Sequence, residues 1–101
     1  MTDPNEIRGG ERPWDAIAID PRDDVAVALR DIEGETRVLV GGEIRIVRVA
    51  TRIPMGHKFA MRNLPAGEFI LKYGQRIGVT TCPVLLGGHV HVHNLKSCRA
   101  R

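Results

Sequence analysis

The feature that most constrains the fold of this chain is a series of short apolar runs, nearly all of which end at or near a glycine or a proline. No apolar pattern at helical spacing persists for three turns, which argues against long helices. The runs instead alternate with polar residues or are continuously apolar over a few positions, as β-strands do. We therefore predict a mainly β fold of about six to eight short strands. The frequent corners favour a compact, partly closed small barrel over a large sandwich.

Several turns can be predicted individually. Gly41-Gly42 lies between two β-rich runs and predicts a two-residue hairpin turn, because both central residues of the favoured turn need positive φ. Residues 30–35 are expected to form a turn before a strand at 36–40. A further hairpin is predicted with its turn at Gly74-Gln75.

The chain length and the first residues set the domain organisation. With 101 residues, the chain is expected to form one domain. Residues 1–13 combine two prolines, a glycine pair and alternating charges, which predicts a mobile tail before a folded domain at 14–101. A domain of this size buries only about 60 to 70% of its unfolded surface, so it is expected to depend on a partner. Exposed strand edges also favour self-association.

Charge and composition exclude several classes of partner. The 15 basic residues against 12 acidic ones are scattered, and aromatic residues make up only 4%, which argues against nucleic-acid binding. No apolar run is long enough to span a membrane, and the first residues do not resemble a secretory leader. We expect a cytoplasmic protein, in which Cys82 and Cys98 are ordinary thiols.

The run from His89 to Asn94 alternates histidine with valine. This period of two predicts a strand with three imidazoles on one face. His91 and His93 would then lie about 6.5 to 7 Å apart and could share one ligand, whereas His89 and His93, about 13 Å apart, could not meet at one ion. From the residues alone, three roles stay open for His91 and His93: a hydrogen-bonded or solvated face, metal ligation, and proton transfer.

Four separated motifs resemble, in the same order, the N-terminal domain of the altronate and galactarate dehydratase family. They lie at 23–29, 53–60, 72–78 and 88–95. The resemblance implies a SAF-type β-clip fold. This domain also occurs as the separate small subunit of two-component lyases.

The resemblance implies a function as the small SAF subunit of a hydro-lyase acting on a sugar acid such as altronate or galactarate. The chain would contribute one wall of the substrate site and would be inactive without a large dehydratase subunit. Two alternatives are the small subunit of a sulfolactate-type sulfo-lyase and a stand-alone module that binds hydroxy acids or carbohydrates. A structural or chaperone domain, as in flagellar members of the fold, is disfavoured by the missing secretion signal.

The resemblance also carries over candidate site residues. Histidine can donate or accept a proton near neutral pH, lysine can hold a carboxylate, and asparagine can bind hydroxyl groups. The expected catalytic residues are His57, His91 and His93, and the expected substrate-binding residues are Lys58, Asn94 and Asp24.

Two positions depart from the family pattern, since Asp24 replaces a usual asparagine and Gly88 a common glutamate. The iron dependence of relatives implies a divalent metal, iron or manganese. We expect the partner subunit to hold it mainly, with His91 and His93 as alternative ligands on this chain.

Overall fold

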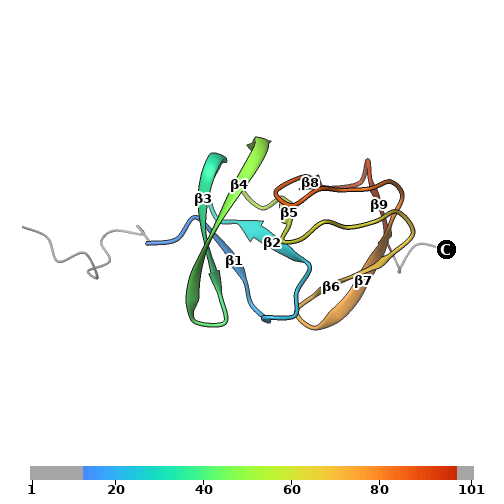
Figure 1. Cartoon of the computed structure of the whole chain (residues 1–101), viewed down its shortest axis with the longest axis horizontal. Coiled ribbons are helices and arrows are strands. Elements are labelled where there is room, and N and C mark those ends of the chain that lie inside the picture. Colours follow the sequence, from blue (N-terminus) through green and yellow to red (C-terminus); the bar gives the residue numbers. More distant parts are fainter. Residues whose placement is uncertain (1–12, 98–101) are drawn as a thin grey trace, which may run out of the picture.

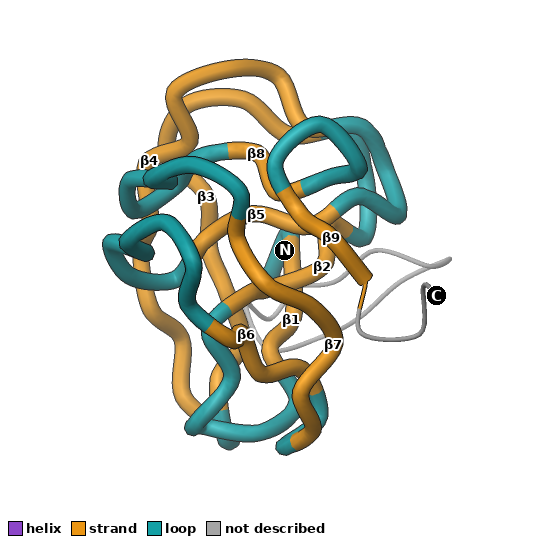
Figure 2. The backbone as a smooth tube through the Cα atoms, turned by 90° about the vertical axis from the view of Figure 1, so that its right-hand side faces the viewer, coloured by secondary structure: helices purple, strands orange, loops and turns teal. Residues whose placement is uncertain are grey.

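The structure, a computed structural model, describes residues 13–97, and every regular element in this range is a strand. The predicted mainly β fold is therefore confirmed, and Figure 2 shows only strands and loops in the described part of the chain. The tail predicted at 1–13 falls, except for its last residue, outside the described residues. The described strands are β1 (Ala16–Ala18), β2 (Val25–Ala28), β3 (Ile32–Val40), β4 (Glu43–Ile53), β5 (Lys58–Ala60), β6 (Phe69–Lys72), β7 (Gln75–Thr80), β8 (His89–Val90) and β9 (Leu95–Ser97).

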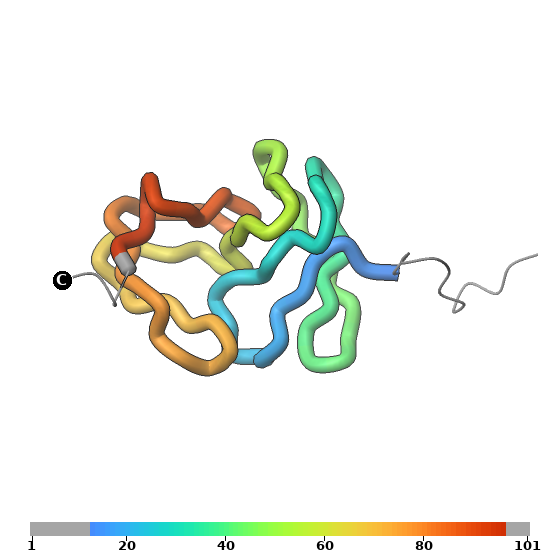
Figure 3. The backbone as a smooth tube through the Cα atoms, turned by 180° about the vertical axis from the view of Figure 1, so that it is seen from behind, coloured from blue at the N-terminus to red at the C-terminus, as the bar shows by residue number. Residues whose placement is uncertain are grey.

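The strands form two sheets. The larger sheet has six strands in the order β4-β3-β1-β2-β5-β8, and the smaller has three in the order β6-β7-β9. Only the β1–β3 pairing is parallel among the described strands. The long β3–β4 hairpin lies at one end of the molecule and the β6–β7 hairpin at the other, as seen from the front and from behind (Figures 1 and 3).

The hairpin turns follow from residues that tolerate positive φ. Gly41 and Gly42 have φ of 54° and 88°, which confirms the turn predicted there. The second hairpin turns at Tyr73 and Gly74, with φ of 55° and 74°, one residue earlier than predicted. Gln75 instead begins β7.

The turn predicted at 30–35 is wrong, because β3 already begins at Ile32. The pairing of β3 with β4 shifts between Ile32 and Gly34, and Gly34 has a φ of 71°. A glycine in this conformation forms a β-bulge, which bends a strand without ending it.

The core consists of two apolar clusters separated by strands β2 and β5. Neighbouring residues of a strand point to opposite faces. Accordingly, Ala26 and Phe59 belong to the cluster formed with β1, β3 and β4. Val25 and Ala60 belong to the second cluster, formed with β6, β8 and the loops around them.

An approximate internal two-fold relates the segment 58–71 to the segment 78–91. Leu64 and Val84 occupy matching places and pair with each other through two backbone hydrogen bonds of 2.7 and 2.8 Å. Gly67 and Gly87, with φ of 76° and 83°, make the matching turns that follow. The two-fold also exchanges the β5–β8 pairing with the β7–β6 pairing.

A buried polar side chain holds each copy of this repeat. The carboxylate of Asp24 accepts a hydrogen bond of 2.8 Å from the backbone N–H of Leu71. At the matching place, Asn94 Oδ1 accepts one of 2.9 Å from the N–H of His91. Asp24 and Asn94 are therefore structural counterparts.

Candidate functional site

The two histidine motifs meet because β5 pairs with β8. Lys58 lies opposite Val90, and Phe59 lies opposite His89. His57 immediately precedes β5, and His91 immediately follows β8. The sheet pairing therefore brings residues from distant parts of the sequence to one edge of the larger sheet (Figure 1).

The run from His89 to Asn94 is not a regular strand, contrary to the prediction. β8 ends at Val90, and the chain turns before β9 begins at Leu95. Asn94 holds this turn: its Oδ1 accepts from the N–H of His91 at 2.9 Å, and its Nδ2 donates to the carbonyl of His89 at 2.7 Å. An asparagine that bonds nearby backbone favours a turn, and here it overrides the strand-like alternation.

The turn gathers four imidazoles. The rings of His57 and His91 stack with centroids 4.2 Å apart. His57 Nδ1 lies 2.9 Å from His89 Nε2, so one of these nitrogens donates a hydrogen bond to the other. The His93 ring lies only 5.3 Å from that of His89. The expected separation of about 13 Å was wrong because it assumed a regular strand.

His89 was therefore missed as a site residue. One nitrogen from each of His57, His89 and His91 falls within 4.8 Å of the others, whereas His93 is not part of this group. We name these three residues the histidine trio. The presence of Asn94 at the end of the run was the sequence signal that could have indicated a turn and with it the approach of His89.

Burial lowers the pKa of two histidines of the trio and so favours their neutral form. It is the main cause that lowers the pKa of His89, and the neighbouring His57 and His93 lower it further. Burial also lowers the pKa of His91, followed by the charges of His57 and Lys58. The pKa of Lys58 itself is lowered by burial and then by Lys72. This corner of the molecule therefore favours the neutral form of His89 and His91 and places them beside the amino group of Lys58.

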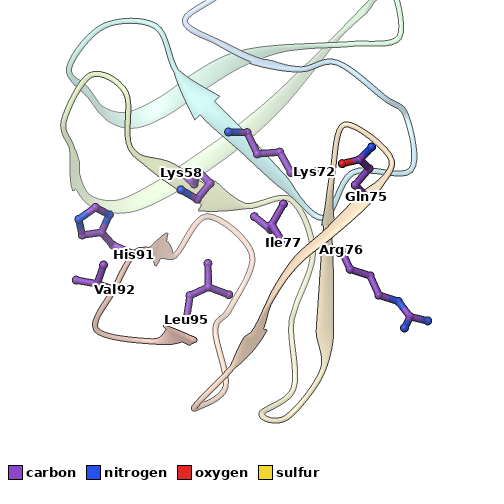
Figure 4. A pocket seen from close by; sticks show the side chains of 8 residues that line it. All are labelled: Lys58, Lys72, Gln75, Arg76, Ile77, His91, Val92 and Leu95. Carbon is purple, nitrogen blue, oxygen red and sulfur yellow. The ribbon is translucent and has the colours of Figure 1, made fainter. Parts of the chain in front are cut away.

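A cavity of about 550 Å³ opens beside this corner. Figure 4 shows Lys58, Lys72 and His91 on one side of it, near the apolar side chains of Ile77 and Leu95. No acidic residue is among those that line the cavity, which suits an anionic ligand. The full lining is Lys58, Lys72, Gln75, Arg76, Ile77, His91, Val92 and Leu95.

Among the lining residues, Arg76 directs its guanidinium away from Lys58 and His91 (Figure 4). Its guanidinium instead lies 4.6 Å from the ring centre of Phe69. The positive charge near His91 in this cavity therefore comes from Lys58 and Lys72 and not from Arg76 (Figure 4).

The remaining predicted site residues do not line this cavity. Asn94 and Asp24 are 5% and 7% exposed, and their polar atoms bond within the protein. Asp24 Oδ1 accepts a hydrogen bond of 2.7 Å from Arg62 Nε, in addition to its bond with Leu71. The ring of His57 stacks on that of His91, and His93 is exposed at the turn.

Comparison with known families confirms the resemblance seen in the sequence. The family model described as "Altronate/galactarate dehydratase SAF domain" matches residues 14–98. The chain is a member of this SAF-domain family. Its four motifs and its β fold agree with that assignment.

Two kinds of enzyme are among the relatives of this SAF domain. The altronate dehydratases of Escherichia coli (strain K12) and Bacillus subtilis (strain 168) are each 37% identical over 81 residues, covering 80% of the chain and 16% of the relative. The (2R)-sulfolactate sulfo-lyase subunit alpha of Paracoccus pantotrophus is 47% identical over 47 residues, covering 46% of the chain and 70% of the relative. The SAF domain thus spans only a small part of the dehydratases that it matches.

A membrane-spanning helix is not found among residues 13–97.

Proposed function

We propose that this SAF domain is the small subunit of a lyase that removes water from a sugar acid such as altronate or galactarate. The observation that carries the proposal is the cavity where Lys58 and His91 lie side by side without an acidic residue in the lining. Membership of the family and similarity to altronate dehydratases support the choice of reaction.

The residues at the cavity suit the steps of an elimination. A base takes the proton beside the substrate carboxylate, the bond to the β-hydroxyl breaks, and that hydroxyl leaves as water after gaining a proton. The ammonium groups of Lys58 and Lys72 would hold the carboxylate and oppose the negative charge that builds up on it. His91, which borders the cavity and whose pKa is lowered by burial, would accept or return a proton.

The other predicted catalytic histidines would act at a greater distance from the substrate. His57 stacks on His91 and would fix the orientation of its ring. His93 is exposed on the turn and would face a partner. Asn94 and Asp24 would position backbone rather than bind substrate, because their polar atoms already bond within the protein.

A large subunit would supply the rest of the enzyme. The dehydratase relatives are far longer than this chain, which matches only 16% of their length. The sulfo-lyase relative is named a subunit, which supports a two-component arrangement. The large subunit would form the other wall of the cavity and would hold most ligands of a divalent metal, iron or manganese.

A sulfolactate-type sulfo-lyase is the second candidate. The chain covers 70% of the alpha subunit from Paracoccus pantotrophus at 47% identity, a larger share than for the dehydratases. A cavity lined by lysines would also accept a sulfonate group.

Co-purification followed by an assay tests both candidates. The full chain, carrying an affinity tag, would be expressed at its natural level, and bound proteins would be identified by mass spectrometry. We expect a stoichiometric large subunit, and we expect the purified pair to dehydrate altronate or galactarate. Release of sulfite from sulfolactate instead would favour the second candidate. A chain recovered alone would contradict the subunit role.

Substitutions in the active pair test the assignment of residues. We expect His91→Ala to lower turnover by about 10²- to 10⁴-fold while the subunits still assemble, because it removes a proton-transfer group. Lys58→Met should chiefly raise KM. Lys96→Ala, a substitution of an exposed lysine outside the cavity lining, is the control and should change neither parameter. Unchanged turnover in His91→Ala would refute the proposed role of His91.

A further inference from the structure

We propose that the histidine trio binds a divalent transition metal, so that this chain carries a metal site of its own. One nitrogen from each of His57, His89 and His91 lies within 4.8 Å of the other two. All three side chains are partly buried, which limits the water that would compete for the ion. The trio differs from the His91 and His93 pair suggested by the sequence.

The backbone positions of the trio are fixed by hydrogen bonds. The β5–β8 pairing sets His89 opposite Phe59, two residues beyond His57. Asn94 binds the backbone of both His89 and His91. The carbonyl of His57 also accepts a hydrogen bond of 2.9 Å from the N–H of Ala28. Because the backbone is held on both sides, metal binding needs only side-chain rotation.

The distances are close to those of a three-nitrogen site. His57 Nδ1 and His89 Nε2 are 2.9 Å apart, as a hydrogen-bonded pair. Two nitrogens that bind one tetrahedral zinc at about 2.0 to 2.1 Å lie about 3.3 Å from each other. These two nitrogens would therefore separate by a few tenths of an ångström, while the stacked ring of His91 would turn toward them. In the metal-bound chain His91 would act as a ligand, and in the metal-free chain it would be available for proton transfer.

The chemistry of the trio selects the class of ion. Neutral imidazoles suit zinc, iron, cobalt, nickel or copper, whereas magnesium and calcium prefer oxygen ligands. Three histidines leave a fourth position open, as in catalytic zinc sites. Since the trio has no carboxylate, the ion would keep its full charge and take an anionic fourth ligand, and the lysine-lined cavity beside His91 favours such an anion.

Metal titration of the full chain tests this proposal without a partner or a substrate. We expect one Zn²⁺ per chain by calorimetry, one Co²⁺ per chain with the absorption spectrum of a tetrahedral site, and no binding of Mg²⁺. His89→Ala should weaken Zn²⁺ binding by at least about tenfold, because it removes a ligand. His93→Ala is the matched control, since it removes an imidazole from the same turn but outside the trio, and its affinity should stay within about threefold of the parent.

Nitrogen chemical shifts of the imidazoles provide a second measurement. Zn²⁺ should move the ring-nitrogen resonances of His57, His89 and His91 much more than those of His93. If His89→Ala does not fold, as judged by circular dichroism, His57→Gln gives the same test. Absence of binding, equal weakening by His93→Ala, or undiminished affinity in the folded ligand variant would each overturn the proposal. A chain that binds metal but lacks lyase activity in the reconstituted pair would refute only the proposed function.

Discussion

At the scale of single residues, Asp24 and Asn94 are polar side chains that hydrogen-bond to the protein backbone and do not line the cavity. Both were expected to bind substrate, and both are buried with an oxygen bonded to a backbone N–H, that of Leu71 in β6 for Asp24 and that of His91 for Asn94. The sequence could not reveal the role of Asp24, because the N–H of Leu71 lies 47 residues away and only the fold brings it near. His91 lies three residues before Asn94, so the turn held by Asn94 was open to prediction from the sequence. The two side chains differ in their second bond, since Asn94 Nδ2 donates to the carbonyl of His89 whereas Asp24 accepts from Arg62.

Substitution of Asn94 tests this role. Asn94→Ala leaves a backbone N–H and a backbone carbonyl without their partner in a buried place, so we expect a loss of about 1 to 3 kcal/mol in the free energy of unfolding. Asn63→Ala is the control, because Asn63 also accepts from a loop N–H, that of Leu86, but is exposed to water that can replace it. Its cost should stay below about 1 kcal/mol in urea titrations. Equal costs would contradict the argument.

The carboxyl group of Asp20 should titrate unusually low. The side chain and backbone N–H of Arg22 bond to it and lower its pKa from 3.8 to about 2. A lowered folded pKa means that this contact stabilises the fold fully above about pH 4 and is lost as the pH falls through 2. Carboxyl ¹³C shifts followed by NMR should give this midpoint. In Arg22→Ala the midpoint should rise, whereas a parent value near 3.8 would refute the prediction.

At the scale of elements, the two-fold repeat offers a matched pair of glycines. A Cβ on Gly67 would meet nothing within 4 Å, whereas one on Gly87 would lie 2.1 Å from the carbonyl oxygen of Arg48 in β4. Gly67→Ala should therefore cost only the strain of positive φ, about 1 to 2 kcal/mol. Gly87→Ala should cost about 1 to 3 kcal/mol more in urea unfolding, because the loop before β8 must move off β4. Similar costs would show that the loop does not pack as described.

The fold class and most strands could be predicted because they depend on local pattern. Alternation, apolar runs and the Gly41-Gly42 pair act within a few residues, and the β3–β4 and β6–β7 hairpins follow from them. The bulge at Gly34 was mistaken for a turn, because glycine is common both in turns and in β-bulges, where its φ is positive. The number of strands was underestimated because β8 and β9 are short and lie on either side of the histidine turn.

The site was predictable in its composition but not in its geometry. His57, Lys58 and His91 were expected to lie together, and the β5–β8 pairing places them so. The inclusion of His89 depended on where β8 ends. The hydrogen bonds of the Asn94 side chain determine where β8 ends, and an argument from the alternation of residues does not take such bonds into account.

At the scale of the whole molecule, β2 and β5 contribute side chains to both apolar clusters, so we expect the two clusters to unfold together. Each strand gives alternate residues to each cluster. Leu64→Ala, in the second cluster, should cost about 2 to 5 kcal/mol. The single tryptophan, Trp14, precedes β1 on the side of the first cluster and should report the same lowered urea midpoint as circular dichroism. An unchanged fluorescence midpoint would show that the clusters unfold separately.

The approximate two-fold also gives each position of the histidine trio a counterpart in the other copy, although β6 continues through Leu71 whereas β8 ends at Val90. Phe69, Leu71 and Ile77 stand at the places that match His89, His91 and His57. Apolar side chains thus occupy one of the two matching corners and imidazoles the other. For protein engineering, histidines introduced at Phe69, Leu71 and Ile77 would show whether three imidazoles come together without the turn that follows β8.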